Sequence, residues 1–413
     1  MRFLIMEKKI ARFMKLYPWY YGFNADLLFY IAIDTLFLTL VKNFSAAQIV
    51  AISSLSQFVC IALQFPVLFI IKRIGNTASA RTGSFFLLLS AVFITVCKNY
   101  YLVLLGRIFH DVACIFRNAA IVSLENNLEL VDRRSDFIKV RTSGNTIYAT
   151  VTMLISFVAS FLFNLNYYLP MIGCIACCTT GLILSFFMKD YSGYNKIAPG
   201  QVKQKKIKFH YSWLIILALI VYALFYPLVN EGQSIGKLFI QQQLLDNLSE
   251  DRTALIIGVI VCASRIIRVF SNVIFAHLYK KHTNKVGIGL PTLLGLALAC
   301  LLFGSMIPPM ILKIPVMAVG YIIILFSRDP FRLYMQDVIL ENTPKEQHQT
   351  LLTLMEFGIK VGTAGMGLVF SAFLVGSPMS VVVAIMLAVT VIEIIMSIKL
   401  YQMILAAKAA KKV

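Results

Sequence analysis

Long apolar stretches alternate with short polar segments along the chain, and each stretch has about the length of a membrane-spanning helix. A helix of about 20 apolar residues crosses the hydrocarbon core of a bilayer, which is roughly 30 Å thick. The pattern predicts about twelve transmembrane helices, and therefore an all-α integral membrane protein. The expected spans are 22–44, 46–71, 82–96, 100–124, 143–163, 167–188, 213–238, 253–278, 286–306, 311–339, 350–375 and 379–401.

Ionisable side chains inside these spans follow the order of the spans with a period of three. The first, fourth, seventh and tenth spans carry them, whereas the third, sixth and ninth carry none. A charge is costly in hydrocarbon, so it survives mainly where it faces protein, water or a substrate. We therefore expect the first, fourth, seventh and tenth helices to surround a polar interior, although the eighth and eleventh also carry charges.

Composition supports the membrane interpretation and excludes a soluble globular domain. Apolar residues make up 59% of the chain and charged residues 14%, with a mean hydropathy of +0.81. Such values lie far from those of soluble domains. The cysteines and histidines show no metal-ligand spacing, so we expect neither a metal site nor another cofactor.

The net charge of +19 reflects topology rather than nucleic-acid binding. Lys and Arg gather in the N-terminus, the even-numbered connections and the C-terminus. The odd-numbered connections contain only Lys98 and Arg252, and Lys42 and Lys313 lie beside such connections at the ends of spans. The positive-inside rule then places both termini in the cytoplasm of a multi-pass protein of the cell membrane. We expect no nucleic-acid partner, contacts between the basic face and membrane lipid, and a monomer.

The basic segment 189–212 is the longest polar connection, and it predicts a cytoplasmic linker between two six-helix halves, residues 1–188 and 213–413. A faint internal repeat agrees with this division. Phe116-Arg117 in the fourth span has a counterpart in Phe331-Arg332 in the tenth.

Two six-helix halves, a basic central loop and polar residues in helices one, four, seven and ten resemble the major facilitator superfamily. The resemblance implies alternating access around a substrate site near the bilayer midplane. The connection Lys72-Arg73-Ile74-Gly75-Asn76 is similar to the loop signature of this family at Arg73 and Gly75, which implies a gating role for both. Lys72 stands where the family has an aspartate.

The first and fourth spans hold the candidate proton-coupling residues. Asp26 and Asp34 are about two helical turns apart and can face one cavity; Asp34 is the deeper and the preferred group. In the fourth span, Arg107 and Asp111 are one turn apart and can pair. His110 lies beside Asp111, and a histidine next to an acid can change charge near physiological pH. An internal salt bridge that only holds the helix in place is the alternative.

Candidate substrate contacts and gates lie in the fourth, seventh, eighth and tenth spans. Proline predicts a helix break in the seventh and tenth spans, because it removes a backbone hydrogen bond. The two arginines of the eighth span can hold a substrate anion or pair with an acid of another helix, namely Asp329, Asp337 or Glu356. The two arginines of the tenth span can jointly hold an anion or be neutralised by Asp329 and Asp337 of the same span. The substrate or cavity candidates are Arg107, Arg117, Asn230, Glu231, Gln233, Arg265, Arg268, Arg328 and Arg332; further proton-coupling candidates are Asp329 and Asp337; further gating candidates are Pro227 and Pro330.

These features favour a secondary active transporter of a small organic solute, zwitterionic or weakly anionic, coupled to protons or to another cation. A polytopic membrane transferase using His110 and Asp111 as acid and base is the enzyme alternative. A non-transporting receptor or scaffold, in which the charges only stabilise helix packing, is the third interpretation.

Overall fold

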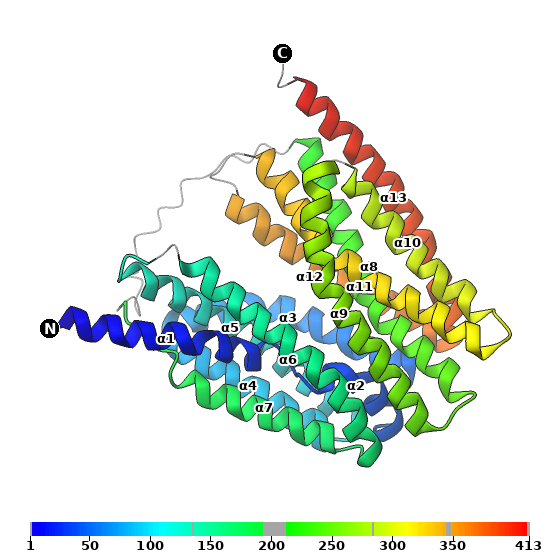
Figure 1. Cartoon of the computed structure of the whole chain (residues 1–413), viewed down its shortest axis with the longest axis horizontal. Coiled ribbons are helices and arrows are strands. Elements are labelled where there is room, and N and C mark those ends of the chain that lie inside the picture. Colours follow the sequence, from blue (N-terminus) through cyan, green and yellow to red (C-terminus); the bar gives the residue numbers. More distant parts are fainter. Residues whose placement is uncertain (1, 134–135, 193–211, 283–284, 344–347, 411–413) are drawn as a thin grey trace. The chain divides into compact units, whose positions relative to one another are not determined.

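The computed structural model describes residues 2–133, 136–192, 212–282, 285–343 and 348–410, and these form thirteen α-helices and one π-helix with no strand (Figure 1). Residues 193–211 of the expected linker lie outside the described part. The elements are α1 Arg2–Asn24, α2 Tyr30–Leu36, η1 Phe37–Val41, α3 Ala46–Ile74, α4 Asn76–Val96, α5 Tyr100–Glu129, α6 Phe137–Leu165, α7 Leu169–Ser185, α8 Trp213–Leu245, α9 Glu250–His282, α10 Val286–Ser305, α11 Met310–Glu341, α12 His348–Gly376 and α13 Met379–Ala410.

Within the described residues, eight helices are long and apolar enough to cross a bilayer. Others fall outside these criteria for identifiable reasons, since α7 has only 17 residues and α5 carries the charges of Arg107, Asp111 and Arg117. The expected multi-pass, all-helical membrane protein is therefore confirmed in its general form.

The first expected span, 22–44, is not one continuous helix. Helix α1 ends at Asn24 and α2 begins at Tyr30. Upstream of the expected span, Phe13, Tyr17 and Tyr20 of α1 are buried and pack among residues of α4, α5 and α6. Helix α1 is thus part of the folded core.

The chain divides into two compact units. The first comprises Met1–Phe37 and Ser56–Lys203, and the second Leu38–Leu55 and Gln204–Val413. Helix α3 therefore contributes its first turns to the second unit and the remainder to the first. The two units are defined by contacts in space, so their boundaries do not follow the order of the sequence.

In the first unit, α1 lies beside α6 and α7, and α4 lies beside α5 and α7 (Figure 1). Glycines permit the closest approach of α4 and α5. A Cβ atom at Gly83 would lie 3.0 Å from Cβ of Phe116, and one at Gly106 would lie 3.0 Å from Cβ of Phe93. Small residues at such contacts let helix backbones approach closely, which is how membrane helices gain packing energy.

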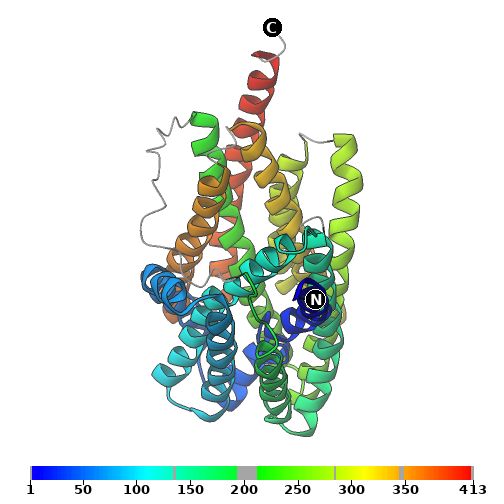
Figure 2. The same cartoon turned by 90° about the vertical axis from the view of Figure 1, so that its left-hand side faces the viewer.

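In the second unit, α8 packs against α11, α12 and α13, and α10 lies beside α11 and α13 (Figure 2). The expected breaks at proline are absent, because α8 continues through Pro227 and α11 through Pro330. Pro227 cannot donate to the carbonyl of Ala223. Gly362 of α12 lies against that carbonyl, so a neighbouring helix packs on the site where a break was expected.

The junction of α3 and α4 contains the two gating residues implied by the family resemblance. Gly75 has φ of 82°, a conformation that favours glycine because side chains rarely adopt it. Arg73 is exposed near the end of α3. The family has an aspartate where this chain has Lys72, but a carboxylate is still present at this junction. It belongs to Asp190, whose Oδ2 accepts a hydrogen bond from Asn76 at 2.8 Å.

Asp190 connects three segments of the first unit after the end of α7. Its Oδ2 also accepts from Asn126 of α5 at 3.0 Å, and its Oδ1 accepts from Ser192. Its backbone N–H donates to Thr77 of α4. Burial by itself would raise the pKa of Asp190, but the hydrogen bonds from Ser192, Asn76 and Asn126 outweigh burial and lower that pKa below its ordinary value.

The lowered pKa of Asp190 predicts an acid-sensitive contribution to stability. Because the folded state favours the ionised carboxylate, this contribution is complete above the unfolded pKa of about 3.9 and is lost as the pH falls through the lower folded pKa. Asp190→Asn should therefore reduce the loss of stability on acidification in this range. Thermal unfolding of the wild type and the variant across pH measures the effect, with exposed Asp132→Asn as the control. Equal acid sensitivity in all three proteins would contradict the prediction.

Candidate functional site

The interruption between α1 and α2 is the centre of the candidate site. Residues 25–29 are not helical, although no proline lies there. Asp26 instead provides a local alternative to the helix, since its Oδ1 accepts a hydrogen bond from the N–H of Leu27 at 2.8 Å. Asn and Asp side chains compete with the helical backbone in this way. We call residues 25–29 the break.

Helix α7 supports both ends of the break through two glycines about two turns apart. A Cβ atom at Gly181 would lie 2.5 Å from Nδ2 of Asn24, and one at Gly173 would lie 3.0 Å from the ring of Phe29. Cys174 and Cys178 are buried in the same helix. The sixth span carries no charge, yet one of its faces receives the break.

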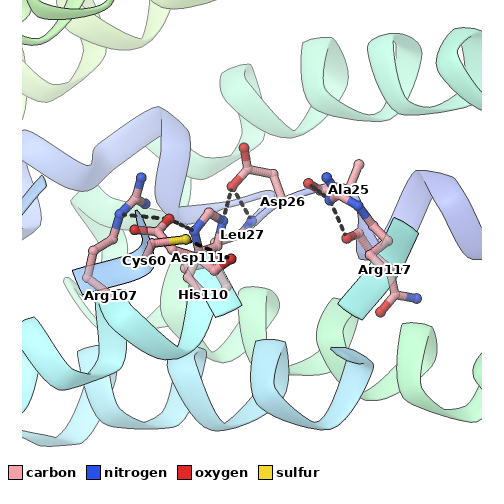
Figure 3. Close-up of polar contacts among 9 residues, drawn as sticks. Ala25, Asp26, Leu27, Cys60, Arg107, His110, Asp111 and Arg117 are labelled. Atoms are coloured by element: carbon pink, nitrogen blue, oxygen red, sulfur yellow. Dashed lines mark hydrogen bonds and ion pairs between the residues drawn. The ribbon is translucent and has the colours of Figure 1, made fainter. Parts of the chain in front are cut away.

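Arg117 of α5 satisfies backbone carbonyls that the end of α1 leaves without helical partners. Its Nη1 donates to the carbonyl of Asn24 at 2.9 Å and to the carbonyl of Ala25 (Figure 3). The last carbonyls of a helix have no intrahelical donor and carry the negative end of the helix dipole. The guanidinium therefore stabilises the interruption both as a donor and as a positive charge.

His110 of α5 joins Asp26 of the break to Asp111. Its Nε2 lies 2.8 Å from Oδ1 of Asp26, and its Nδ1 lies 3.0 Å from Oδ1 of Asp111 (Figure 3). Arg107 Nε lies 3.9 Å from the same oxygen of Asp111, so the expected pairing along α5 is confirmed. His110 and Asp111 are both buried, whereas the side chain of Asp26 is 30% exposed.

The two contacts of His110 impose a proton requirement. An ionised carboxylate only accepts hydrogen bonds, and a neutral imidazole has a single N–H. Both contacts are therefore complete only when the ring is protonated or when one of the acids carries a proton. Without that proton, one ring nitrogen of His110 and the carboxylate oxygen that it contacts are both acceptors, and no hydrogen bond can join them. Proton loss at this cluster must weaken a contact to the break or to Asp111.

Several contributors to this site were missed by the sequence interpretation. Cys60 approaches the backbone carbonyl of Asp111, with Sγ at 3.8 Å. The carbonyl acceptors and the two glycines of α7 have no chemical signature of their own in a sequence. Asn24-Ala25-Asp26 inside an apolar stretch was the available signal for the break.

Asp34, the preferred proton-coupling candidate, lies in α2, where its Oδ1 accepts from the N–H of Thr35 at 2.7 Å.

The arginines of the second unit divide into paired and unpaired groups. Arg268 of α9 forms a two-pronged ion pair with Asp329 of α11, with Nε–Oδ2 at 2.7 Å and Nη2–Oδ1 at 3.0 Å. Arg332 pairs with Glu356 of α12. Interhelical pairing, one of the two expectations for Arg268, is confirmed. Arg332 was expected to bind an anion or to be neutralised within its own helix, and its partner is instead an acid of α12.

Arg328 and Arg265 form no ion pair with an acid within the described part of the chain. Arg328 donates to the hydroxyl of Tyr226 at 3.1 Å and its guanidinium lies 5.3 Å from the centre of that ring. Nε of Arg265 and Nε2 of Gln233 are buried without a hydrogen-bond partner. Glu231 is 3% exposed. Asn230 adjoins Glu231 in α8, whereas Asp337 is exposed near the end of α11.

No protein-family model and no curated protein sequence matches the chain. Solved structures do match over nearly the whole length. The nucleoside transporter NupG is 12% identical, with a TM-score of 0.71, over 95% of this chain and 99% of that chain. A bacterial homologue of the iron transporter ferroportin in an inward-facing state gives 12% and 0.70 over the same shares. The POT family transporter PepTSo gives 12% and 0.68 over 96% and 98%.

These similarities define the fold, since the sequence identities are too low to carry more. The chain has the fold of major facilitator superfamily transporters, as the pattern of charged and uncharged spans led us to expect. The similar structures named above are transporters and not enzymes.

Proposed function

We propose that the chain is a proton-coupled secondary active transporter of a small organic solute. In this proposal α1 and α2 are the halves of one interrupted crossing, so the thirteen helices make twelve crossings. Residues 1–188 and 213–413 are the two halves, joined by the linker 189–212, with both termini in the cytoplasm of the cell membrane. The nucleoside transporter, the homologue of an iron transporter and the POT family transporter that share this fold support the general activity, and they leave the solute open.

The observation that carries the proposal is that the protonatable side chains of His110 and Asp111 are connected to an interrupted helix. His110 contacts Asp26 at 2.8 Å, and Asp26 belongs to the break. Discontinuous helices in membrane transporters place backbone groups at substrate and ion sites. Because proton loss weakens a contact of His110, the charge of the cluster and the geometry of the break are linked. That linkage is what a proton-driven conformational change requires.

A zwitterionic or weakly anionic solute fits the unpaired groups best. Arg328 has a hydroxyl and a ring as its neighbours, and a carboxylate would pair with its guanidinium more strongly than either. Glu231 has the opposite charge when ionised and can receive an ammonium group. Arg268 and Arg332 already have acidic partners, so we assign them to positioning rather than to primary solute binding. We propose that the transporter acts as a monomer.

Transport by the purified chain in liposomes tests this function. A panel of amino acids, dipeptides, nucleosides and small carboxylates should reveal at least one solute that accumulates when an inward proton gradient is imposed. An uncoupler should abolish the accumulation. Arg328→Gln should weaken uptake of that solute at least tenfold, with Lys98→Gln as the exposed control. Absence of uptake across the panel, or product formation by the detergent-solubilised chain, would contradict the proposal and favour the transferase alternative.

A further inference from the structure

A second concave site lies in the first unit, between α1 and α6, and the proposed transport function does not use it. The cavity has a volume of about 460 Å³. It lies where the candidate membrane span of α6, Lys139–Leu165, begins. Met14, Pro18 and Trp19 of α1 line one side, and Val140 and Ile147 of α6 line the other.

The cavity lies between α1 and α6 around Lys15 and Lys139. The two helices are in tight contact beyond it, at Gly22 and Gly144. A Cβ atom at Gly22 would lie 2.7 Å from Cγ2 of Ile147, and one at Gly144 would lie 3.3 Å from the side chain of Tyr21. These contacts close the deep end of the cavity. We call this cavity between α1 and α6 the wedge.

The charged side chains of this wedge lie at its outer end, whereas apolar side chains line its whole length. Lys15 and Lys139, one from each helix, line the outer part, whereas Trp19 and Ile147 lie one or two turns deeper. A charged outer end and an apolar deep end match a lipid at the membrane interface. Tryptophan is itself enriched at that level of the bilayer, and Trp19 is 50% exposed.

The charges of the cavity favour an anion. Arg133 is neutralised by Asp136, with Nη2–Oδ2 at 2.6 Å. Lys15 and Lys139 have no acidic partner among the described residues, and both are exposed. Two ammonium groups on opposite sides of one cavity attract a phosphodiester, while the apolar wall receives the glycerol and the upper acyl chain.

We infer that this wedge binds the headgroup of an anionic phospholipid. Basic pockets between transmembrane helices bind acidic lipid headgroups through such contacts. A bound lipid would bridge α1 and α6 and so stabilise the arrangement of the helix that ends at the break. Unlike general contact with the bilayer, binding at this site would saturate and would depend on Lys15 and Lys139.

Fluorescence of a single tryptophan tests the proposal directly. The chain has 2 tryptophans, so Trp213→Phe leaves Trp19 as the only one. We expect phosphatidylglycerol brominated near the headgroup to quench Trp19 at a lower mole fraction than equally brominated phosphatidylcholine. Two unpaired lysines at about 1 kcal/mol each correspond to a preference of about thirtyfold. Equal quenching by the two lipids, or no quenching by either, would overturn the proposal.

Lysine substitutions locate the preference and separate lipid from free phosphate. In the Trp213→Phe background, Lys15→Gln with Lys139→Gln should remove the preference, whereas Lys8→Gln with Lys9→Gln, exposed on the same helix, should retain it. Each single substitution should lower it about fivefold, which keeps the test informative if the double variant fails to fold. Inorganic phosphate should not displace the brominated lipid. Full displacement by phosphate, or a preference unchanged by both lysine substitutions, would refute a lipid site.

Discussion

Asp26→Asn is expected to abolish accumulation driven by a proton gradient while leaving exchange of solute across the membrane. Asparagine has nearly the size of aspartate and can still accept a hydrogen bond from His110, so the break should persist. The amide cannot take up or release a proton, and its NH2 group can donate to Nε2 when the ring is neutral, so the connection between His110 and the break no longer depends on pH. We expect gradient-driven uptake at the level of liposomes without protein. Uptake and counterflow of the same solute, measured in parallel, separate the two activities.

Asp34→Asn is the matched control, because Asp34 was the preferred coupling residue on sequence grounds. In the structure Asp26 contacts His110, whereas Asp34 accepts from the N–H of the next residue, Thr35. We expect Asp34→Asn to keep gradient-driven uptake. If Asp26→Asn accumulates solute normally and Asp34→Asn does not, the coupling residue is Asp34, as the sequence predicted, and not Asp26. Loss of both accumulation and exchange in Asp26→Asn would indicate a structural role for the carboxylate.

Arg117→Met is expected to give the largest loss of stability. Methionine fills much of the same space, but it removes the donor to the carbonyls of Asn24 and Ala25. Water cannot readily replace that donor inside a membrane protein, and each unsatisfied polar group there is costly. We expect the free energy of unfolding to fall by about 2–5 kcal/mol. Thermal unfolding of the detergent-solubilised chain, followed by circular dichroism, measures the change.

Arg81→Met provides the comparison for this prediction. Arg81 also donates to a backbone carbonyl, that of Phe186, but at 3.4 Å and in an exposed position. Water can satisfy that carbonyl when the arginine is removed, so we expect a loss below about 1 kcal/mol. Similar losses in the two variants would mean that Arg117 does not stabilise the break. Its role would then lie in solute binding.

The sequence predicted helix pairing through charge but not which helix is interrupted. Proline pointed to breaks at Pro227 and Pro330, yet α8 and α11 continue through both. The break occurs instead at Asn24-Ala25-Asp26, which contains no proline. A helix stops when the freed backbone groups find other partners, and here those partners are Arg117 and the glycines of α7, roughly 90 to 160 positions away in the chain.

The candidate site was predicted in part for a related reason. His110 and Asp111 are adjacent in sequence, and Arg107 is one turn away, so their proximity follows from helix geometry alone. Asp26 joins them only because α1 ends beside α5. Arg268 needed an acidic partner in another helix, but the choice of Asp329 from among the available acids depends on how α9 packs against α11.

By itself, the sequence determined that this protein is helical, spans a membrane, and keeps its charges in particular helices. These properties follow from hydropathy and from the cost of a charge in hydrocarbon, which act on each segment separately. The tertiary structure decided where the first crossing breaks, which acid His110 contacts across helices, and which arginines remain unpaired. Those outcomes depend on contacts between segments far apart in the chain, and no local pattern of residues encodes such contacts.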